Sequence, residues 1–358
     1  MTGEGLIDFI EQVSGGTHLR VEENLGDGFV RLRSAEAERR QAKHDVRCVE
    51  DIVIEMLRNA RDASAHAVFL ATSKEAAIRT LTVIDDGVGI PANLHERIFE
   101  PRVTSKLETM VMDNWGVHGR GMALYSIKCN VEEAKVACSQ PSLGSSFIVS
   151  IDTEQLSEKT DQSSYPSIEK DDEGNLHITK GPHNIIRCAL EFSLEHRKSI
   201  EVYLGSPVEV AATLAEFGHR RLDTDALLFC DDIQTLPLCE RLAASADAAE
   251  FVETCLAMGL SISERTAHRI LSRQIAPLKP ALEKVLPTRS NRGSGDIDLY
   301  KDNRGLKLAK EDVESFSREM ERAFEPLAER YYLSLTDVPK IRVKGDTITV
   351  RFQIDKEI

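Results

Sequence analysis

Three short segments in a fixed order, all within residues 55–125, constrain this chain more than any other feature of its sequence. In the first segment, residues 55–63, apolar residues recur at intervals of three and four, which predicts an amphipathic helix. Because residues three and four apart share a helix face, Glu55, Asn59 and Asp62 are expected to lie side by side. One face of this helix would therefore carry two carboxylates and an amide.

The second and third segments each predict a glycine-rich turn. Residues 82–91 begin with β-branched residues and continue into an acidic pair followed by Gly87 and Gly89, as in a strand that runs into a tight turn. Residues 115–125 place three glycines before a run of helix formers, which predicts a loop at a helix N-terminus, where backbone amides can bind phosphate. Each segment alone is common, but together they indicate the parts of one nucleotide site.

In this order the segments resemble the GHKL superfamily of Bergerat-fold ATPases, which includes DNA gyrase B subunits, heat-shock chaperones, MutL and histidine kinases. Residues 55–63 are similar to the N box of that superfamily, residues 85–89 to its first glycine box and residues 116–121 to its second. Residues 98–106 look like a histidine-kinase segment that ends in the Thr-Ser-Lys of MutL. The resemblance covers residues 25–152, which is less than half of the chain.

The resemblance implies an α/β fold, a two-layer α+β sandwich in which helices back a mixed sheet, with ATP and Mg²⁺ as ligands. Strands are expected at residues 134–138 and 147–151. Residues 144–147 resemble the last box of the superfamily, where a small hydroxyl residue precedes an apolar strand. Ser146 is the candidate for that residue.

The helix face of the N box can be assigned chemical roles. Asn59 can offer a neutral carbonyl oxygen to Mg²⁺, which prefers hard oxygen ligands and keeps waters and phosphate oxygens around it. Glu55, one turn earlier, is placed to accept a proton from an attacking nucleophile. In the superfamily the matching acid orients water, or a serine hydroxyl in the protein-kinase branches. Asp62 is expected to position the helix rather than to bind the ligand directly.

The first glycine box is expected to bind the base. By resemblance, Asp85 accepts a hydrogen bond from the adenine amino group, and Gly87 and Gly89 let the backbone approach the ring.

The phosphate end of the site is expected to follow the Thr-Ser-Lys segment. Lys106 is the candidate cation that would stabilise charge on the transferred phosphoryl group. Residues 107–118 would form a lid over the nucleotide. The candidate phosphate-binding residues of the second glycine box and its flank are Gly116, Gly119, Arg120, Gly121 and Met122.

These roles imply an ATP-binding protein, expected to be a slow Mg²⁺-dependent ATPase whose nucleotide state is transmitted to its C-terminal half. Two alternatives stay open, a protein serine kinase in signalling and an ATP-gated, DNA-associated switch. Many histidine kinases have Asn where this chain has Glu55, and no phosphoacceptor histidine helix precedes it, which argues against an autophosphorylating histidine kinase. Homodimer formation on ATP binding is a habit of the superfamily that this sequence neither shows nor excludes.

Composition sets broad limits on the chain. With 358 residues, 41% of them hydrophobic, two globular domains are expected. No apolar run is long enough for a bilayer and no signal segment begins the chain, so a cytoplasmic protein without a membrane partner is expected. The seven cysteines lack zinc-like spacing and are expected to be reduced thiols. The net charge of −14 argues against a surface that binds nucleic acid throughout, but it permits a local basic face.

The expected domain plan has four parts. Residues 1–24 would form an N-terminal helical extension and residues 25–152 the ATP-binding domain. The polar, charged residues 153–180 would form a linker. Residues 181–358 would form a second, largely helical α+β domain that matches no known family and carries the contact with a protein partner or DNA.

Within the C-terminal half, residues 251–271 resemble a helix-turn-helix with Gly259 at the turn, but the turn is longer than in the compact motif and an ordinary pair of packed helices explains the pattern better. Residues 264–310 contain eleven Lys or Arg against five Asp or Glu, so this region is basic within an acidic chain and could contact phosphate. A long charged helix is expected at residues 309–332 and a β-hairpin at residues 340–354.

Overall fold

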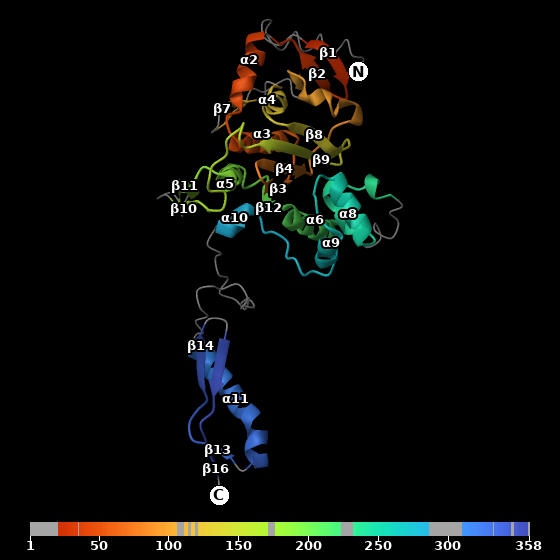
Figure 1. The fold of residues 1–358 in the computed structure, drawn as a ribbon. Helices are drawn as coiled ribbons and strands as arrows, with labels where there is room; N and C mark the ends of the chain where they lie inside the picture. The colour runs from red at the N-terminus through yellow and green to blue at the C-terminus, as the bar shows by residue number, and fades with distance from the viewer. Residues whose placement is uncertain are drawn as a thin grey trace. The chain divides into compact units, whose positions relative to one another are not determined.

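The protein divides into two compact units, residues Met1–Thr288 and Arg289–Ile358 (Figure 1). The computed structural model describes residues 21–34, 36–105, 111–113, 116–118, 121–170, 176–222, 232–285, 310–331, 333–344 and 347–356.

The first unit is built on a five-stranded sheet in the order β12-β3-β4-β9-β8. Its strands are β3 (Ala67–Glu75), β4 (Ile78–Asp85), β8 (Glu133–Ser139), β9 (Ser145–Asp152) and β12 (Glu201–Gly205). β12 runs parallel to β3, and all the other neighbours are antiparallel. The predicted α/β fold with a mixed sheet is confirmed.

Helices cover the first face of this sheet. They are α3 (Val49–Asp62), α4 (Ala123–Asn130) and α5 (Ile185–Glu195), and α2 (Glu36–Asp45) packs beside α4. Because side chains alternate along a strand, Val68 and Leu70 of β3 point into this core, together with the buried apolar face of α3. The period of three and four residues read from the N box therefore corresponds to a helix buried against the sheet.

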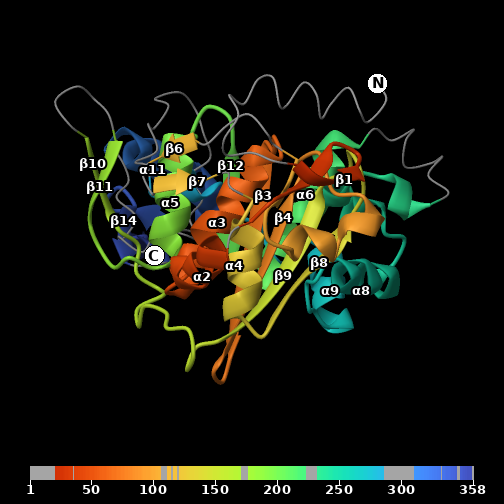
Figure 2. The ribbon, with the colours of Figure 1, turned by 90° about the horizontal axis from the view of Figure 1, so that it is seen from above.

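A second helical layer covers the opposite face (Figure 2). It consists of α6 (Pro207–Arg221), the 3₁₀ segment η4 (Leu238–Ala244), α8 (Ala248–Ala257) and α9 (Glu264–Leu271). Phe69 of β3 stacks on Tyr203 of β12 at 4.9 Å and meets Phe217 of α6 edge to face at 5.1 Å. The sheet thus has one more layer than the expected two-layer sandwich, because residues after 181 pack on the face that the sandwich leaves open.

The division expected at residues 153–180 does not coincide with the boundary between the two units, which lies between Thr288 and Arg289. The segment after β9 is tied to α3, because Glu50 accepts hydrogen bonds from the Lys159 backbone at 3.0 Å and from Gln162 at 2.7 Å. A short hairpin, β10 (Ser167–Lys170) and β11 (Leu176–Lys180), follows. The segment is polar because hydrogen bonds to the buried Glu50 carboxylate, and not apolar packing, attach it to α3. Its composition therefore resembles that of a linker.

Smaller elements complete the first unit. A three-stranded sheet joins β1 (Val21–Gly26), β2 (Phe29–Leu32) and β5 (Val103–Thr104). The hairpin β6 (Val111–Asp113) and β7 (Gly116–His118) follows β5. The remaining short helices are η1 (Ala92–Leu94), η2 (Arg97–Phe99), η3 (Ile233–Thr235) and α10 (Ala281–Val285).

The second unit consists of α11 (Lys310–Tyr331) and two antiparallel strand pairs. β14 (Lys340–Lys344) pairs with β15 (Thr347–Arg351), and β13 (Leu333–Leu335) pairs with β16 (Ile354–Lys356). Phe324 of α11 stacks on Phe352 at 5.1 Å. The long helix and the hairpin predicted for this part of the chain are confirmed. No helix in the described part of the chain has both the length and the apolar character needed to cross a membrane.

Candidate nucleotide-binding site

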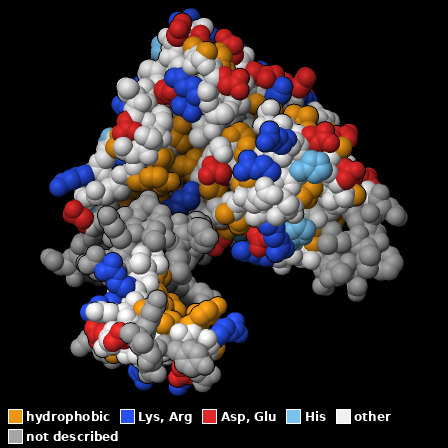
Figure 3. All heavy atoms as spheres, turned by 60° about the horizontal axis from the view of Figure 1, so that its bottom comes forward, with side chains coloured by type: hydrophobic (Ala, Val, Ile, Leu, Met, Phe, Trp, Pro, Cys, Tyr) orange, Lys and Arg blue, Asp and Glu red, His pale blue; other side chains and the backbone are white. Residues whose placement is uncertain are grey.

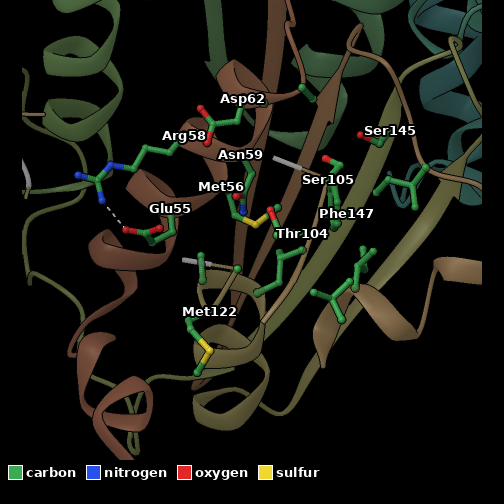
Figure 4. A pocket seen from close by; sticks show the side chains of 18 of the residues that line it. Glu55, Met56, Arg58, Asn59, Asp62, Thr104, Ser105, Met122, Ser145 and Phe147 are labelled. Carbon is green, nitrogen blue, oxygen red and sulfur yellow. Dashed lines mark hydrogen bonds and ion pairs between the residues drawn. The ribbon is translucent and has the colours of Figure 1, made fainter. Parts of the chain in front are cut away.

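A cavity of about 680 Å³ opens on the first face of the central sheet, between α3, the ends of β4 and β9, and the start of α4 (Figure 4). Its polar lining includes side chains from six elements, α2, α3, β4, β5, α4 and β9. The polar residues that line it are Gln41, Asp45, Glu55, Arg58, Asn59, Asp62, Asp85, Thr104, Ser105, Ser126 and Ser145.

The predicted face of the N box helix lines this cavity. Glu55, Asn59 and Asp62 all lie on α3 and all contribute to the cavity wall. The Arg58 guanidinium donates a hydrogen bond to the Glu55 carboxylate at 2.5 Å, and the two side chains are 5% and 24% exposed (Figure 4). The Asp62 carboxylate accepts a hydrogen bond from the side chain of its neighbour Arg61 at 3.1 Å.

Asp85 lies at the end of β4 and is only 2% exposed. The Ser145 hydroxyl donates to one carboxylate oxygen at 2.7 Å and the Gly87 amide donates to the other at 2.9 Å. Burial raises the pKa of Asp85 to about 6, the two hydrogen bonds oppose that rise, and the neighbouring Asp86 carboxylate adds to it. The cavity therefore ends in a buried acceptor whose charge changes within the range of ordinary buffers.

The candidate Ser146 is corrected to its neighbour Ser145. Asp85 of β4 pairs with Ser145 of β9, so these two side chains share the cavity face of the sheet. Ser146 points to the opposite face, where its hydroxyl donates to the Met258 carbonyl at 2.7 Å. The physical reason is that successive side chains of a strand point to opposite faces of the sheet, so an assignment that is one residue off selects the wrong face.

The turn that follows β4 requires glycine. Gly89 has a φ of +68°, and a Cβ placed there would lie 1.9 Å from the Gln140 carbonyl oxygen. A Cβ on Gly87 would lie 2.7 Å from the Ala63 carbonyl oxygen. Gly89 lines the cavity, while Gly87 contributes its amide to Asp85. The glycines of the first box therefore bring the backbones of three segments together around the buried carboxylate.

The predicted phosphate end is described only in part. Gly121 and Met122 line the cavity, and the Gly121 carbonyl accepts from the Arg102 amide at 2.8 Å, which joins the two ends of the segment 103–121. Gly116 begins β7. Lys106, Gly119 and Arg120 lie outside the described residues.

Comparison with protein families bears directly on this geometry. Residues 44–155 match the family described as histidine kinase-, DNA gyrase B-, and HSP90-like ATPase. Residues 44–155 are a GHKL-type ATPase domain. No curated protein matches the chain. The match begins at the end of α2 and ends just after β9, so the cavity-lining parts of α3, β4, α4 and β9 all fall within this GHKL domain.

Asn59 provides a test of whether the residues of the GHKL domain fit Mg²⁺ and a nucleotide. Its side-chain nitrogen is buried and has no hydrogen-bond partner among the described residues. A buried polar group without a partner costs free energy, so an amide that lines a cavity in this state suits a polar ligand. Within the described residues no cluster of three His, Cys, Asp or Glu could hold a metal by itself. The unpaired nitrogen is a hydrogen-bond donor and suits an oxygen of the nucleotide, and the amide oxygen beside it is the atom that could contact Mg²⁺.

Several lining residues were missed by sequence reasoning. Gln41 and Asp45 reach the cavity from α2, whose charged sequence shows no distinct apolar face that would have marked them. Thr104 and Ser105 belong to the same Thr-Ser-Lys segment as Lys106, and that pattern could have identified them. Arg58 had no signal, because an arginine between two site residues of a helix usually faces solvent.

Proposed function

We propose that this protein binds ATP with Mg²⁺ in the cavity of its GHKL domain and hydrolyses it slowly, with Glu55 as the general base. The observation that carries the proposal is the placement of Glu55 and Asn59 one turn apart on α3, facing the same cavity as the buried carboxylate of Asp85. Glu55 and Ser145, the partner of Asp85, lie on opposite sides of that cavity (Figure 4).

Recognition of the base falls to Asp85. Its buried carboxylate accepts the hydrogen bond of the adenine amino group, and the hydroxyl of Ser145 holds it in the orientation that this contact needs. Gly87 and Gly89 permit the close backbone packing that places this carboxylate at the cavity.

Hydrolysis is assigned to the opposite side of the cavity. Mg²⁺, when bound, supplies positive charge next to the phosphate oxygens, and Asn59 contributes its neutral carbonyl oxygen to the metal. Glu55 removes a proton from water as the water oxygen bonds to the γ-phosphorus and the bond to the β–γ bridging oxygen breaks, which gives ADP and phosphate. Arg58 holds the Glu55 carboxylate while it waits for that proton.

The remaining phosphate contacts are assigned to residues that flank the described wall of the cavity. Lys106 follows Thr104 and Ser105, which line the cavity, and Gly119 and Arg120 precede Gly121, which also lines it. We assign Lys106 to the charge that develops on the γ-phosphate and the second glycine box, with Gly116, to amide contacts with phosphate.

The base assignment is tested with Glu55→Gln, which keeps the shape of the side chain and removes its basicity. Loss of a general base lowers turnover by about 10²–10⁴-fold. We expect phosphate release to fall by that amount while calorimetry still detects ATP binding with Mg²⁺. Glu75→Gln, at an exposed carboxylate at the end of β3, is the matched control and should leave turnover unchanged. Equal phosphate release by Glu55→Gln and the parent protein would remove Glu55 from the mechanism.

A protein serine kinase is the alternative for the same site, because Glu55 could take its proton from a serine hydroxyl instead of water. ATP labelled at the γ-phosphate separates the two activities. An ATPase releases the label as inorganic phosphate, whereas a kinase leaves it on protein. Stable label on a protein substrate that is absent with Glu55→Gln would show that the activity is that of a kinase and not hydrolysis. Glu55 would remain the general base.

The proposal includes a structural route from the nucleotide to the C-terminal half. On β9, Ser145 bonds the carboxylate that binds adenine, while the next residue, Ser146, bonds the carbonyl at the end of α8. The contact that supports adenine binding and the contact with the second helical layer are therefore made by adjacent residues of β9. Homodimer formation on ATP binding is part of the same proposal and is tested by light scattering with and without a non-hydrolysable ATP analogue.

A further inference from the structure

Two exposed arginines on α9 and a third in the turn just after it have no ion-pair partner among the described residues. Arg265, Arg269 and Arg273 are all exposed, and within the described part of the chain none of them forms an ion pair. Glu264 is the single acidic residue of α9. Unpaired arginines on one side of a helix form a local positive surface even in a chain of net negative charge.

Arginines on the adjacent helix behave differently. At the end of α6, Arg220 pairs with Glu216 at 3.1 Å, and Arg221 pairs with Asp86 at 3.4 Å and lies over the Phe217 ring. These cations already have partners in the fold. Figure 3 shows Lys, Arg and His side chains beside one another over the part of the first unit that carries α6 and α9, with acidic side chains at the margin.

The second helical layer fixes α9 to the body of the first unit. Ala267 and Ile270, on its inner side, are buried in the core of that layer. The Thr82 hydroxyl of β4 donates to the Gly259 carbonyl at 2.9 Å, just before α9 begins. A Cβ on Gly259 would lie 2.5 Å from the Ile148 side chain of β9, so the backbone rests directly on the sheet. The arginine side of α9 therefore faces outward from a rigid support.

We propose that the exposed side of α9, together with Arg273 in the turn that follows it, binds the phosphate backbone of duplex DNA. The planar guanidinium of arginine matches the geometry of phosphate oxygens and forms two parallel hydrogen bonds with them. Gln274 is exposed beside the arginines and adds a neutral donor of the kind that contacts phosphate and sugar. The contacts are to phosphate, so binding is independent of base sequence.

Duplex DNA fits this surface better than a single strand or a membrane. Proteins that bind single strands stack the bases on exposed aromatic rings, and the aromatic residue of α8, Phe251, is completely buried. Two exposed leucines, Leu256 on α8 and Leu271 at the end of α9, are 56% and 41% exposed and are the features that would favour a lipid surface. An amphipathic helix that lies in a membrane needs a continuous apolar face, and the inner face of α9 is already buried in the protein.

The test measures binding of the full chain to a fluorescent duplex of mixed sequence, without nucleotide, over a series of salt concentrations that begins at about 50 mM. Each phosphate contact contributes about 0.9 to the slope of the logarithm of affinity against the logarithm of salt, so three arginines give a slope of about −2.7. Arg265→Gln, Arg269→Gln and Arg273→Gln should each weaken binding and each reduce the slope by about 0.9. Glu264→Gln removes the acidic residue of α9 and should strengthen binding.

Arg197→Gln is the matched control, because Arg197 is an exposed arginine that follows α5 on the opposite face of the sheet. It should leave both the affinity and the slope unchanged. Retained ATP binding and unchanged thermal unfolding show that each variant is folded. A failure to bind DNA can therefore be distinguished from a failure of the proposed ATPase activity. Two further arms use single-stranded DNA of the same length and vesicles of phosphatidylserine.

Three results would overturn the proposal. The first is no binding of the duplex at low salt. The second is duplex binding that the three arginine variants weaken no more than Arg197→Gln does. The third is tighter binding of single-stranded DNA or vesicles than of the duplex, with the same arginines responsible, which would assign the surface to that other ligand.

Discussion

The two faces of the central sheet are built from the same strands but handle polar groups in opposite ways. On the first face, the Asp85 carboxylate and the Asn59 amide nitrogen are buried beside a cavity, and that nitrogen has no hydrogen-bond partner among the residues that the structure describes. On the second face, Thr82 and Ser146 are buried against backbone carbonyls at 2.9 and 2.7 Å. At these four residues, the polar atom that still lacks a partner lines the cavity, and the hydroxyls that pack against the second helical layer are paired.

The strongest test of this comparison uses three glycines in the left-handed region. Gly144 (φ +89°) would place a Cβ 2.3 Å from the Asp85 carbonyl oxygen, Gly259 (φ +80°) would meet the side chain of Ile148, and Gly26 (φ +84°) would meet nothing within 4 Å. Alanine at Gly26 should cost only the conformational strain of about 1–2 kcal/mol. Alanine at Gly259 should cost about 1–3 kcal/mol more, because a side chain must repack.

Alanine at Gly144 should cost the most of the three, since backbone cannot move aside as a side chain can. The free energy of unfolding in urea measures all three variants. Equal destabilisation by Gly144→Ala and Gly26→Ala would show that the close approach behind Asp85 is not required.

Asp85→Asn is expected to have the next largest effect, on ATP binding. The substitution removes a charge-assisted hydrogen bond worth about 1.5–3 kcal/mol and turns a donor toward the donor of adenine, so affinity should fall by about 100-fold. Isothermal calorimetry with Mg²⁺ and ATP measures the loss. If the variant binds ATP as tightly as the parent protein, adenine is recognised elsewhere in the cavity.

The pKa of Asp85, which burial raises to about 6, predicts a pH dependence that separates ligand binding from stability. ATP needs the ionised carboxylate, so affinity should fall as the pH drops below 6, approaching tenfold per pH unit. The folded pKa lies above the ordinary value of 3.8, so the folded state takes up this proton first. The contribution of Asp85 to the free energy of unfolding therefore decreases as the pH rises from about 4 to about 6.

Acidification should thus weaken nucleotide binding while this carboxyl favours the nucleotide-free fold. Calorimetry and urea unfolding at several pH values, each compared with Asp85→Asn, isolate the group. A parent protein and an Asp85→Asn variant with parallel pH profiles would show that Asp85 does not titrate in this range.

Arg58 should have a moderate effect on turnover. Arg58→Gln removes the guanidinium that holds the Glu55 carboxylate at 2.5 Å, so we expect phosphate release to fall by about tenfold, as for a misplaced base. The affinity for ATP should change little, and Arg58→Lys should recover part of the rate. Steady-state kinetics separates kcat from KM, and a purely structural role would instead lower thermal stability without recovery by lysine.

The smallest expected effect belongs to Ser146→Ala. The substitution removes the hydrogen bond to the Met258 carbonyl and should lower the free energy of unfolding by about 1 kcal/mol without changing ATP affinity. Ser145→Ala, on the adjacent residue, should lower ATP affinity instead. A loss of ATP affinity with Ser146→Ala would show that Ser146 belongs to the nucleotide site despite its place on the opposite face of the sheet.

The parts of this molecule that sequence could predict are those that local periodicity determines. The helix face with Glu55, Asn59 and Asp62 follows from spacing alone, and the strand that ends at Asp85 follows from its β-branched residues and glycines. Ser146 was misassigned because the face of a strand depends on its register with a neighbour sixty residues away, which no local pattern reports.

The second helical layer and the place of β12 were missed for a related reason. β12 joins the sheet beside β3 through parallel pairing of residues more than a hundred positions apart, and its short apolar run resembles any buried strand. The polar composition of the segment before it predicts a linker, because hydrogen bonds such as those to Glu50 leave no apolar pattern in the sequence.

The parallel pairing of β12 with β3 has a practical consequence for anyone who works with a shortened version of this protein. A fragment cut at residue 155, where the family match ends, would lack β12 and both α5 and α6. β3 would become an unprotected outer strand, and Phe69 would lose the two rings that cover it. Exposed strand edges of this kind recruit other chains. The shortest self-contained piece therefore extends to the end of α10 at Val285, well beyond the region that the family defines.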